Sequence, residues 1–77
     1  MRVTVELNGH LSWYVEDGVR VHEVEVEPDS TVGELIEGLG VPPIEVAFAS
    51  IEDERIDLDR VLRDGDRVSL VPIIAGG

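Results

Sequence analysis

The 77-residue chain has no cysteine and no lysine, and it has one residue each of phenylalanine, tryptophan and tyrosine. The lack of cysteine excludes disulfides, zinc sites built on thiolates and catalysis by a cysteine nucleophile. A chain this short forms one small domain, which buries only about 60% of the surface that its unfolded form exposes. Its stability must come from aliphatic residues, here 13 Val, 7 Leu and 6 Ile. Abundant valine and isoleucine favour a β-sheet.

Basic residues are also scarce, because six arginines oppose 17 acidic residues and give a net charge of -11. This negative field disfavours nucleic acids and anionic membranes as partners, since both are bound by basic surfaces. It fits a basic protein partner or simple solubility, and an acidic chain without lysine also fits a high-salt cytoplasm or a GC-rich genome. The sequence has neither a hydrophobic run that could cross a membrane nor a signal-peptide pattern. We therefore expect a cytoplasmic protein that binds neither nucleic acid nor membrane.

Alternating hydrophobic residues predict strands near both ends of the chain, over residues 3–7 and 67–71. We expect these two strands to pair in parallel at the centre of a sheet. Similar alternation predicts a second strand at residues 23–27, a third at 46–51 and a short fourth at 55–56. The result is a mixed sheet of four to five strands.

Hydrophobic residues recur at spacings of three and four between residues 32 and 39, which predicts a short helix with one apolar face. Thr31 followed three residues later by Glu34 predicts a capping box at its start. Gly40 and the prolines after it end the helix. Because so short a helix is marginal alone, we expect it to pack on one face of the sheet, which makes the fold class α+β.

Two connections are less regular. Residues 8–20 are expected to form a long connection that begins with an Asn-Gly turn and includes an extended portion at residues 11–15. Within it, Trp13 and Tyr14 are expected either to cover the core or to belong to the same contact surface as Phe48, Val71 and Ile73. Residues 57–63 are predicted to form a turn or a single helical turn, anchored by its two leucines.

The end of the chain predicts a separate arm. Because proline cannot donate a hydrogen bond to a neighbouring strand, we expect strand pairing to fail at Pro72. This divides the chain into a domain of residues 1–72 and a flexible tail of residues 73–77. The tail ends in Gly76-Gly77, and glycine enters narrow channels and adopts conformations that other residues cannot.

The environment of Phe48 depends on the register of its strand. If Ala49 faces the helix, Phe48 points to the open face of the sheet beside Val71, whereas a shift of one residue places Phe48 in the core. On the open face, Phe48 and Val71 would form an apolar patch that continues to Ile73. Such a patch is typical of a docking surface.

The residue pattern predicts no active site or metal centre within the chain itself. Neither histidine has a second ligand at metal spacing, and the acidic cluster at residues 52–59 lacks the spacing of a calcium loop. We therefore expect a protein that is not an enzyme on its own and that binds no permanent cofactor.

Two stretches carry a resemblance to a known family. The run LRDGDRV at residues 62–68, followed by VPIIAGG at residues 71–77, resembles the close of the MoaD/ThiS family of sulfur carrier proteins. Residues 31–35 are similar to the start of the family's helix. The resemblance covers essentially the whole chain and implies the β-grasp fold of ubiquitin. Residues 51–53 depart from it, because they are Ile-Glu-Asp where many members have Val-Asn-Gly.

The resemblance also implies a chemistry at Gly77. An ATP-dependent activating enzyme, similar to MoeB or ThiF, would adenylate its carboxylate, and sulfur would then replace AMP to give a thiocarboxylate. An acceptor enzyme, similar to the large subunit MoaE, would take the sulfur, while Gly76 gives passage through a narrow channel. On this chemistry Pro72, Ile73, Ile74 and Ala75 position the arm. Together with Phe48 and Val71 of the open-face patch, they are the expected partner-binding residues.

Three alternatives within or beside this family stay open. The long first connection and the tail are most similar to MoaD, the small subunit of molybdopterin synthase, which implies a role in molybdenum cofactor biosynthesis. A ThiS-like carrier for the thiazole of thiamine and an archaeal ubiquitin-like modifier are the alternatives, with a plain interaction module as a further one. The lack of lysine disfavours a polymeric tag. We expect the free protein to be a monomer.

Overall fold

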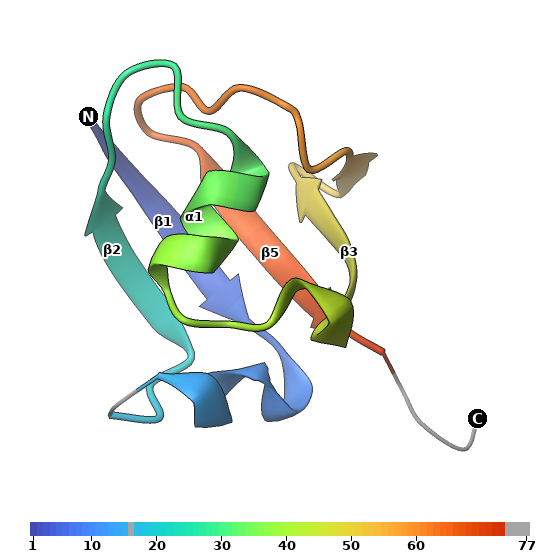
Figure 1. Cartoon of the computed structure of the whole chain (residues 1–77). Helices are drawn as coiled ribbons and strands as arrows, with labels where there is room; N and C mark the ends of the chain where they lie inside the picture. Colours follow the sequence, from blue (N-terminus) through green and yellow to red (C-terminus); the bar gives the residue numbers. More distant parts are fainter. Residues whose placement is uncertain (16, 74–77) are drawn as a thin grey trace.

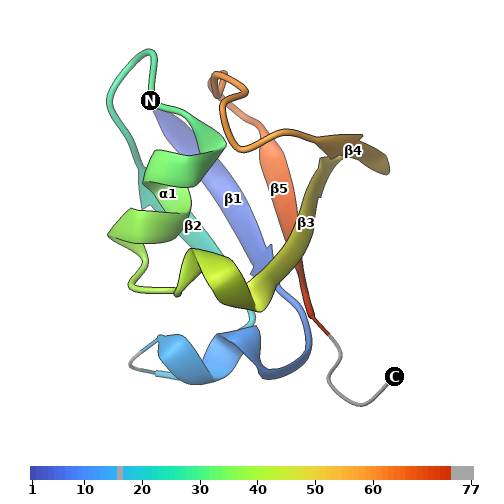
Figure 2. The ribbon, with the colours of Figure 1, turned by 45° about the vertical axis from the view of Figure 1, so that its right-hand side comes forward.

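The computed structural model describes residues 1–15 and 17–73, which form a five-stranded sheet with one α-helix across one face (Figure 1, Figure 2). In chain order the elements are β1 (Arg2–Leu7), the 3-10 helix η1 (Gly9–Tyr14), β2 (Val21–Glu25), α1 (Val32–Gly38), the 3-10 helix η2 (Pro43–Glu45), β3 (Val46–Ile51), β4 (Glu54–Ile56) and β5 (Arg67–Pro72). The strand order is β2-β1-β5-β3-β4, with β1 and β5 parallel at the centre. This confirms the predicted α+β class, the central parallel pair and the β-grasp fold.

The two central strands supply much of the core. In the parallel register Val5 lies opposite Val68 and Leu7 opposite Leu70, and all four side chains are fully buried. Burial of one such side chain contributes roughly 1.5–3 kcal/mol, so this pair of strands holds the sheet together. The other buried hydrophobic residues are Val3, Leu11, Val32, Leu35, Ile36, Val41, Ala49 and Leu62.

The helix α1 begins as predicted. The Thr31 hydroxyl accepts a hydrogen bond from the Glu34 amide at 3.2 Å, and the Glu34 carboxylate accepts one from the Thr31 amide at 3.0 Å. This is the reciprocal capping box, which satisfies two amides that the first turn leaves free. The Val32 amide donates to a group outside the helix, the Arg60 carbonyl at 3.0 Å.

Among residues 1–15 and 17–73, no helix is long and apolar enough to span a membrane.

The connection after β1 is helical where we predicted it to be extended. Residues Gly9–Tyr14 form η1, so both the hairpin turn and the extended portion at residues 11–15 are wrong. The Asn8 side-chain amide donates to the Leu70 carbonyl of β5 at 2.9 Å and is not available to a hairpin. The helical turn that follows brings the Leu11 side chain into the core, where it is fully buried. Burial of Leu11 therefore overrides the local turn signal.

The segment between β4 and β5 contains a turn, closed by a hydrogen bond from the Arg60 amide to the Asp57 carbonyl at 3.1 Å. Leu62 is buried as predicted, whereas Leu58 is 44% exposed and does not anchor the segment. Leu58 acts through its backbone instead, because its carbonyl accepts a hydrogen bond from the Gly33 amide of α1 at 2.8 Å.

Strand pairing does not fail at Pro72. The strand β5 includes Pro72 opposite Val46, and the next amide, of Ile73, donates to the Glu45 carbonyl at 3.0 Å. Successive amides in a strand point to alternate neighbours, so the Pro72 nitrogen faces the other side, beyond the end of β1 at Leu7. The proline therefore costs the ladder no hydrogen bond. Residues 74–77 of the predicted tail lie outside the described residues.

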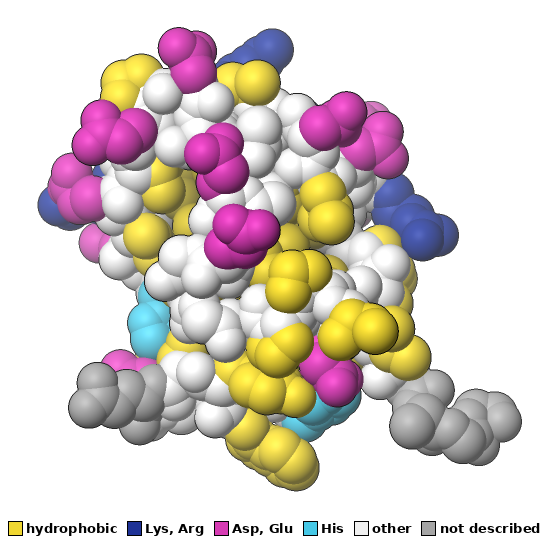
Figure 3. Space-filling model, in the orientation of Figure 1, with side chains coloured by type: hydrophobic (Ala, Val, Ile, Leu, Met, Phe, Trp, Pro, Cys, Tyr) yellow, Lys and Arg dark blue, Asp and Glu magenta, His cyan; other side chains and the backbone are white. Residues whose placement is uncertain are grey.

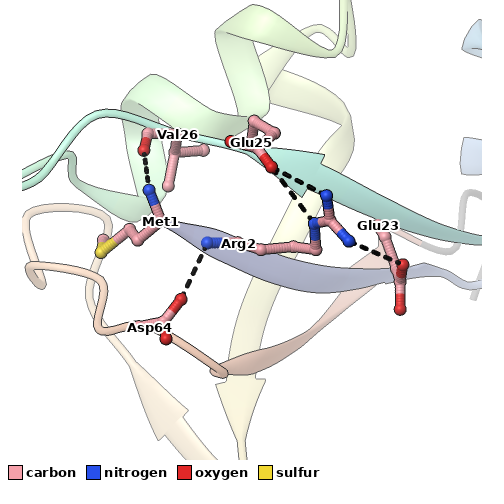
Figure 4. Close-up of polar contacts among 6 residues, drawn as sticks. All are labelled: Met1, Arg2, Glu23, Glu25, Val26 and Asp64. Atoms are coloured by element: carbon pink, nitrogen blue, oxygen red, sulfur yellow. Dashed lines mark hydrogen bonds and ion pairs between the residues drawn. The ribbon is translucent and has the colours of Figure 1, made fainter.

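Polar contacts hold the start of β1 (Figure 4). The Arg2 amide donates to the Asp64 carboxylate at 2.9 Å, which ties β1 to the turn before β5. The Arg2 guanidinium donates to Glu25 at 2.9 Å and lies 3.8 Å from Glu23. The hydrogen bond and charge of Glu25, with the charge of Glu23, raise the pKa of Arg2. These groups are exposed, so solvent screens them and they fix register more than they stabilise.

Asp66 is the acidic residue whose stabilising role depends most clearly on pH. Its carboxylate accepts hydrogen bonds from the Arg60 guanidinium and the Arg63 amide, both at 2.8 Å, and its side chain is 14% exposed. Burial alone would raise the pKa of Asp66, but these hydrogen bonds and charges outweigh it and lower the pKa. A lowered pKa stabilises the fold above the pKa of an unfolded aspartate, about 3.9, and the stabilisation is lost as pH falls through the folded value.

We expect Asp66→Asn to lower the free energy of unfolding at pH 7 by about 1 kcal/mol, because an amide replaces a charge-assisted acceptor. The difference from wild type should shrink towards zero as pH falls below about 3.9. Urea unfolding at several pH values measures it. The exposed Asp59→Asn is the matched control and should leave the free energy of unfolding at pH 7 unchanged. A constant difference at all pH values would contradict the role of the Asp66 charge.

Candidate functional site

Phe48 lies on the open face of the sheet. In the antiparallel pair of β3 and β5, Phe48 is opposite Val71, while the fully buried Ala49 is opposite Leu70. Neighbouring residues of a strand point to opposite faces, so Ala49 faces α1 and Phe48 faces away from it. The register with Ala49 inward is therefore confirmed, and the alternative that places Phe48 in the core is wrong.

The open-face patch is partly covered by a charged side chain. Phe48 and Val71 are both partly buried, and the guanidinium carbon of Arg55 lies 4.5 Å from the centre of the Phe48 ring. A cation over an aromatic face at an exposed site contributes about 0.5–1 kcal/mol. The Arg55 side chain thus covers part of the apolar area that Phe48 would present to a partner.

A second apolar surface lies at the end of the molecule where β5 ends. Trp13 and Ile44 are 81% and 79% exposed, more than any other large hydrophobic side chain in the described residues, and Ile73 is 47% exposed. They border an open groove of about 730 Å³. We call it the tail-root groove; its lining residues are Gly9, His10, Trp13, Ile44, Glu45, Pro72 and Ile73.

Three elements meet at this groove. In both ribbon views η1, η2 and the end of β5 lie together at the end of the molecule opposite Met1 (Figure 1, Figure 2). Figure 3 shows hydrophobic side chains gathered on the lower part of the same face, with an acidic and a histidine side chain among them. The two 3-10 helices and the end of β5 therefore present an apolar surface directly beside the last described residue.

Contacts between these elements fix the shape of the groove. The Ile73 amide donates to the Glu45 carbonyl at 3.0 Å, which joins β5 to η2. The His10 Nε2 and Glu45 Oε2 atoms lie 3.3 Å apart, which joins η1 to η2. Gly9 has a φ of +55°, and a Cβ placed there would lie 2.8 Å from Cγ of Pro72. A side chain at Gly9 would therefore push against the end of β5.

The residues of the first connection divide between core and surface. Leu11 and Ser12 are buried, whereas Trp13 and Tyr14 are exposed, so the hypothesis that Trp13 and Tyr14 cover the core is wrong. Trp13 instead borders the groove beside Ile73. The other hypothesis, one surface shared with Phe48, Val71 and Ile73, agrees with this placement only at Ile73, because the groove includes neither Phe48 nor Val71.

Ile44 is the surface residue that the sequence prediction missed. We interpreted the two prolines before it only as the end of the helix. The available signal was an isolated isoleucine between these prolines and Glu45, outside any helix or strand period. An exposed hydrophobic residue marks a contact surface only where it joins a larger apolar patch, and the neighbours of Ile44 in that patch come from distant parts of the chain.

The remaining predicted site residues lie beyond the described part of the chain. They are Ile74, Ala75, Gly76 and Gly77, and their roles stay predictions. Among residues 1–15 and 17–73, no group of three histidine or acidic side chains could hold a metal ion.

The sequence matches the family described as Mut7-C ubiquitin over residues 1–76. A comparison with curated proteins gave no match. Among solved structures, the chain is similar to SAMP1 from Haloferax volcanii, with 22% identity, a TM-score of 0.75 and 100% of both chains covered. It is similar to a chain in the complex of subunits 1 and 2 of molybdopterin-converting factor from Helicobacter pylori 26695, with 25% identity, a TM-score of 0.65 and 100% of both chains covered. It is also similar to Urm1 from Trypanosoma brucei, with 16% identity, a TM-score of 0.72, and 99% of this chain and 95% of that chain covered.

Proposed function

Because the chain belongs to the Mut7-C ubiquitin family, we propose that it is a sulfur carrier whose Gly77 carboxylate is adenylated and converted to a thiocarboxylate. The similarity to a molybdopterin-converting factor chain supports the resemblance to the MoaD/ThiS family. One observation carries the proposal: the central strand β5 leads directly into a tail that ends in Gly76-Gly77. The domain holds the root of this tail, and partner enzymes supply the catalysis.

The proposed chemistry needs little from the chain beyond a reachable carboxylate. A carboxylate is a poor electrophile, so an activating enzyme transfers AMP from ATP to Gly77 and releases pyrophosphate. The outer sulfur of an enzyme persulfide attacks the acyl carbon and AMP leaves. A thiol then reduces the resulting acyl disulfide, which leaves a thiocarboxylate on Gly77. Because the sulfur is carried on the backbone terminus, the chain needs no cysteine for this role.

The acceptor that we propose is the large subunit of a molybdopterin synthase, with the sulfur used in molybdenum cofactor biosynthesis. The similarity to a chain in a complex of two molybdopterin-converting factor subunits supports this choice. On this proposal the protein is the small subunit of a sulfurtransferase and no enzyme by itself. It uses ATP only through an activating enzyme similar to MoeB or ThiF. A ThiS-like role in thiazole synthesis is the alternative within the same chemistry.

A role as a protein modifier is the second candidate. It is favoured by the similarity to SAMP1, which is described as small archaeal modifier protein 1. In that role the activated Gly77 would be joined to lysine amines of target proteins. Since the 77 residues contain no lysine, the chain could be attached singly but could not be extended through its own side chains.

Intact mass spectrometry tests the proposal. After incubation with an activating enzyme, ATP, a persulfide donor and a thiol, we expect the mass to rise by the difference between a sulfur and an oxygen atom. Deletion of Gly77 should abolish the shift, whereas Gly38→Ala, a glycine change on the exposed side of α1, should keep it. Folded protein that shows no shift with any activating enzyme would exclude the carrier function. High-mass conjugates to lysines in place of the shift would indicate the modifier.

A further inference from the structure

We propose that the tail-root groove is the docking surface for the enzyme that adenylates Gly77, and that this enzyme fills the groove with an apolar side chain flanked by lysine or arginine. The inference rests on the proposed function, because it assumes an enzyme that acts at Gly77. It adds a location and a partner chemistry, which neither the tail sequence nor the comparisons provide.

The length of the tail limits where such an enzyme can lie. Residues 74–77 follow Ile73, and four fully extended residues span at most about 14 Å. The carboxyl carbon of Gly77 therefore stays within about 14 Å of Ile73. An enzyme that encloses this carbon in an active site must bring the rim of its entrance against the surface around Ile73. The groove is part of that surface, since Ile73 is one of its lining residues.

The chemistry of the groove favours a protein side chain over a small molecule. Its volume of about 730 Å³ lies in the range of small-molecule sites, about 300–1,000 Å³. Such sites also carry several polar groups that converge on the ligand. Here the polar side chains of the lining, His10 and Glu45, lie 3.3 Å apart and pair with each other. The free contact area belongs to Trp13 and Ile44, and tryptophan is enriched among residues that dominate binding energy.

The groove is also held in shape before any partner binds. The hydrogen bond from Ile73 to Glu45 and the close approach of Gly9 to Pro72 fix the end of β5 against η1 and η2. A preformed surface loses less conformational entropy on binding than a mobile one. The open-face patch is less suited to this role, because Arg55 already covers part of Phe48.

The charge of the protein indicates which residues should surround the apolar side chain of the partner enzyme. With a net charge of -11, the molecule attracts basic surfaces and repels acidic ones at distances up to about a Debye length, about 8–10 Å in physiological salt. Glu45 adds an acidic group within the groove itself. Lysine or arginine around the apolar side chain would therefore speed encounter and set orientation.

Steady-state kinetics of Gly77 adenylation test the proposal. The probe is an activating enzyme that adenylates the wild-type chain, and the readout is ATP–pyrophosphate exchange against carrier concentration. We expect Ile44→Ser and Trp13→Ala each to raise KM at least about tenfold with kcat unchanged. Both side chains are exposed, so the thermal unfolding midpoint should stay the same. Val61→Ser, an exposed aliphatic residue near the start of α1, is the matched control and should leave KM unchanged.

The other outcomes are informative in different ways. Unchanged KM in both groove variants, with wild type still adenylated, would overturn the docking surface but leave the proposed function standing. A rise confined to Phe48→Ser would place docking on the open face and overturn the proposal. A wild-type dimer that Ile44→Ser dissociates would mean that a second copy fills the groove.

Failure of wild type to be adenylated by any activating enzyme would remove the proposed function and this surface together. A KM that does not rise with salt would exclude the basic rim.

Discussion

Leu70→Ala is expected to lower the free energy of unfolding by about 2–5 kcal/mol. Leu70 is fully buried in the central strand β5, opposite Leu7 on one side and Ala49 on the other. Loss of its side chain removes buried apolar area and leaves a cavity in the core, on the face of the sheet that α1 covers. A domain of this length has a total stability of roughly 4–12 kcal/mol. The change therefore removes a large part of the stability.

Urea unfolding followed by circular dichroism measures this loss. We expect a lower midpoint with an unchanged dependence on urea, because the surface exposed on unfolding hardly changes. Leu58→Ala is the matched control, since it is the same substitution at a side chain that is 44% exposed. It should change the stability by less than about 0.5 kcal/mol. Equal losses in the two variants would contradict the central place of β5.

Gly9→Ala is the second substitution from which we expect a large effect. The φ of +55° at Gly9 would cost an alanine about 1–2 kcal/mol. The added Cβ would also lie 2.8 Å from Cγ of Pro72, and relief of such a contact costs a further 1–3 kcal/mol or so. Because Pro72 is in a paired strand, the displacement should reach the hydrogen bond from Ile73 to Glu45.

Gly18→Ala separates the two effects. Gly18 has a similar φ of +67°, but no heavy atom of the described residues lies within 4 Å of a Cβ placed there. Gly18→Ala should therefore lose only the free energy that a positive φ costs an alanine. The difference in unfolding free energy between the two variants then measures the contact with Pro72. Amide hydrogen exchange at Ile73 is the second measurement, and it should accelerate in Gly9→Ala but not in Gly18→Ala. Equal stability and exchange in both variants would mean that the contact has no consequence.

The sequence could predict the elements that show a regular hydrophobic periodicity or a helix-capping motif. The strand at residues 46–51 and the capping box of Thr31 and Glu34 agree with the structure, because both depend on neighbouring residues alone. The central parallel pair was also predictable, since its strands have alternating, strongly hydrophobic sequences. Local chemistry and tertiary packing demand the same conformation at these positions.

The errors occur where tertiary contacts override local signals. Asn8 predicts a hairpin turn, but its side chain is bound to β5 and burial of Leu11 selects a helical turn. Pro72 predicts the end of pairing, but its nitrogen faces the side on which β1 has already ended. Ile44 gains its importance only because η1 and β5 come to lie beside it. None of these neighbours is close in sequence, so no local pattern could reveal them.

The parallel pairing of β1 with β5 also bears on how the protein is made. Residues 4–7 pair with residues 67–70, so the centre of the sheet joins segments from opposite ends of the chain. Contacts between distant segments form late, because the loop-closure entropy must be lost before they can stabilise anything. In a chain still being synthesised, β1 can pair with β2 along one edge, but its other edge has no partner until β5 has emerged. Folding of the domain and formation of the root of the tail are therefore a single event. A chain cut short before β5 would have neither a complete sheet nor a root for the tail.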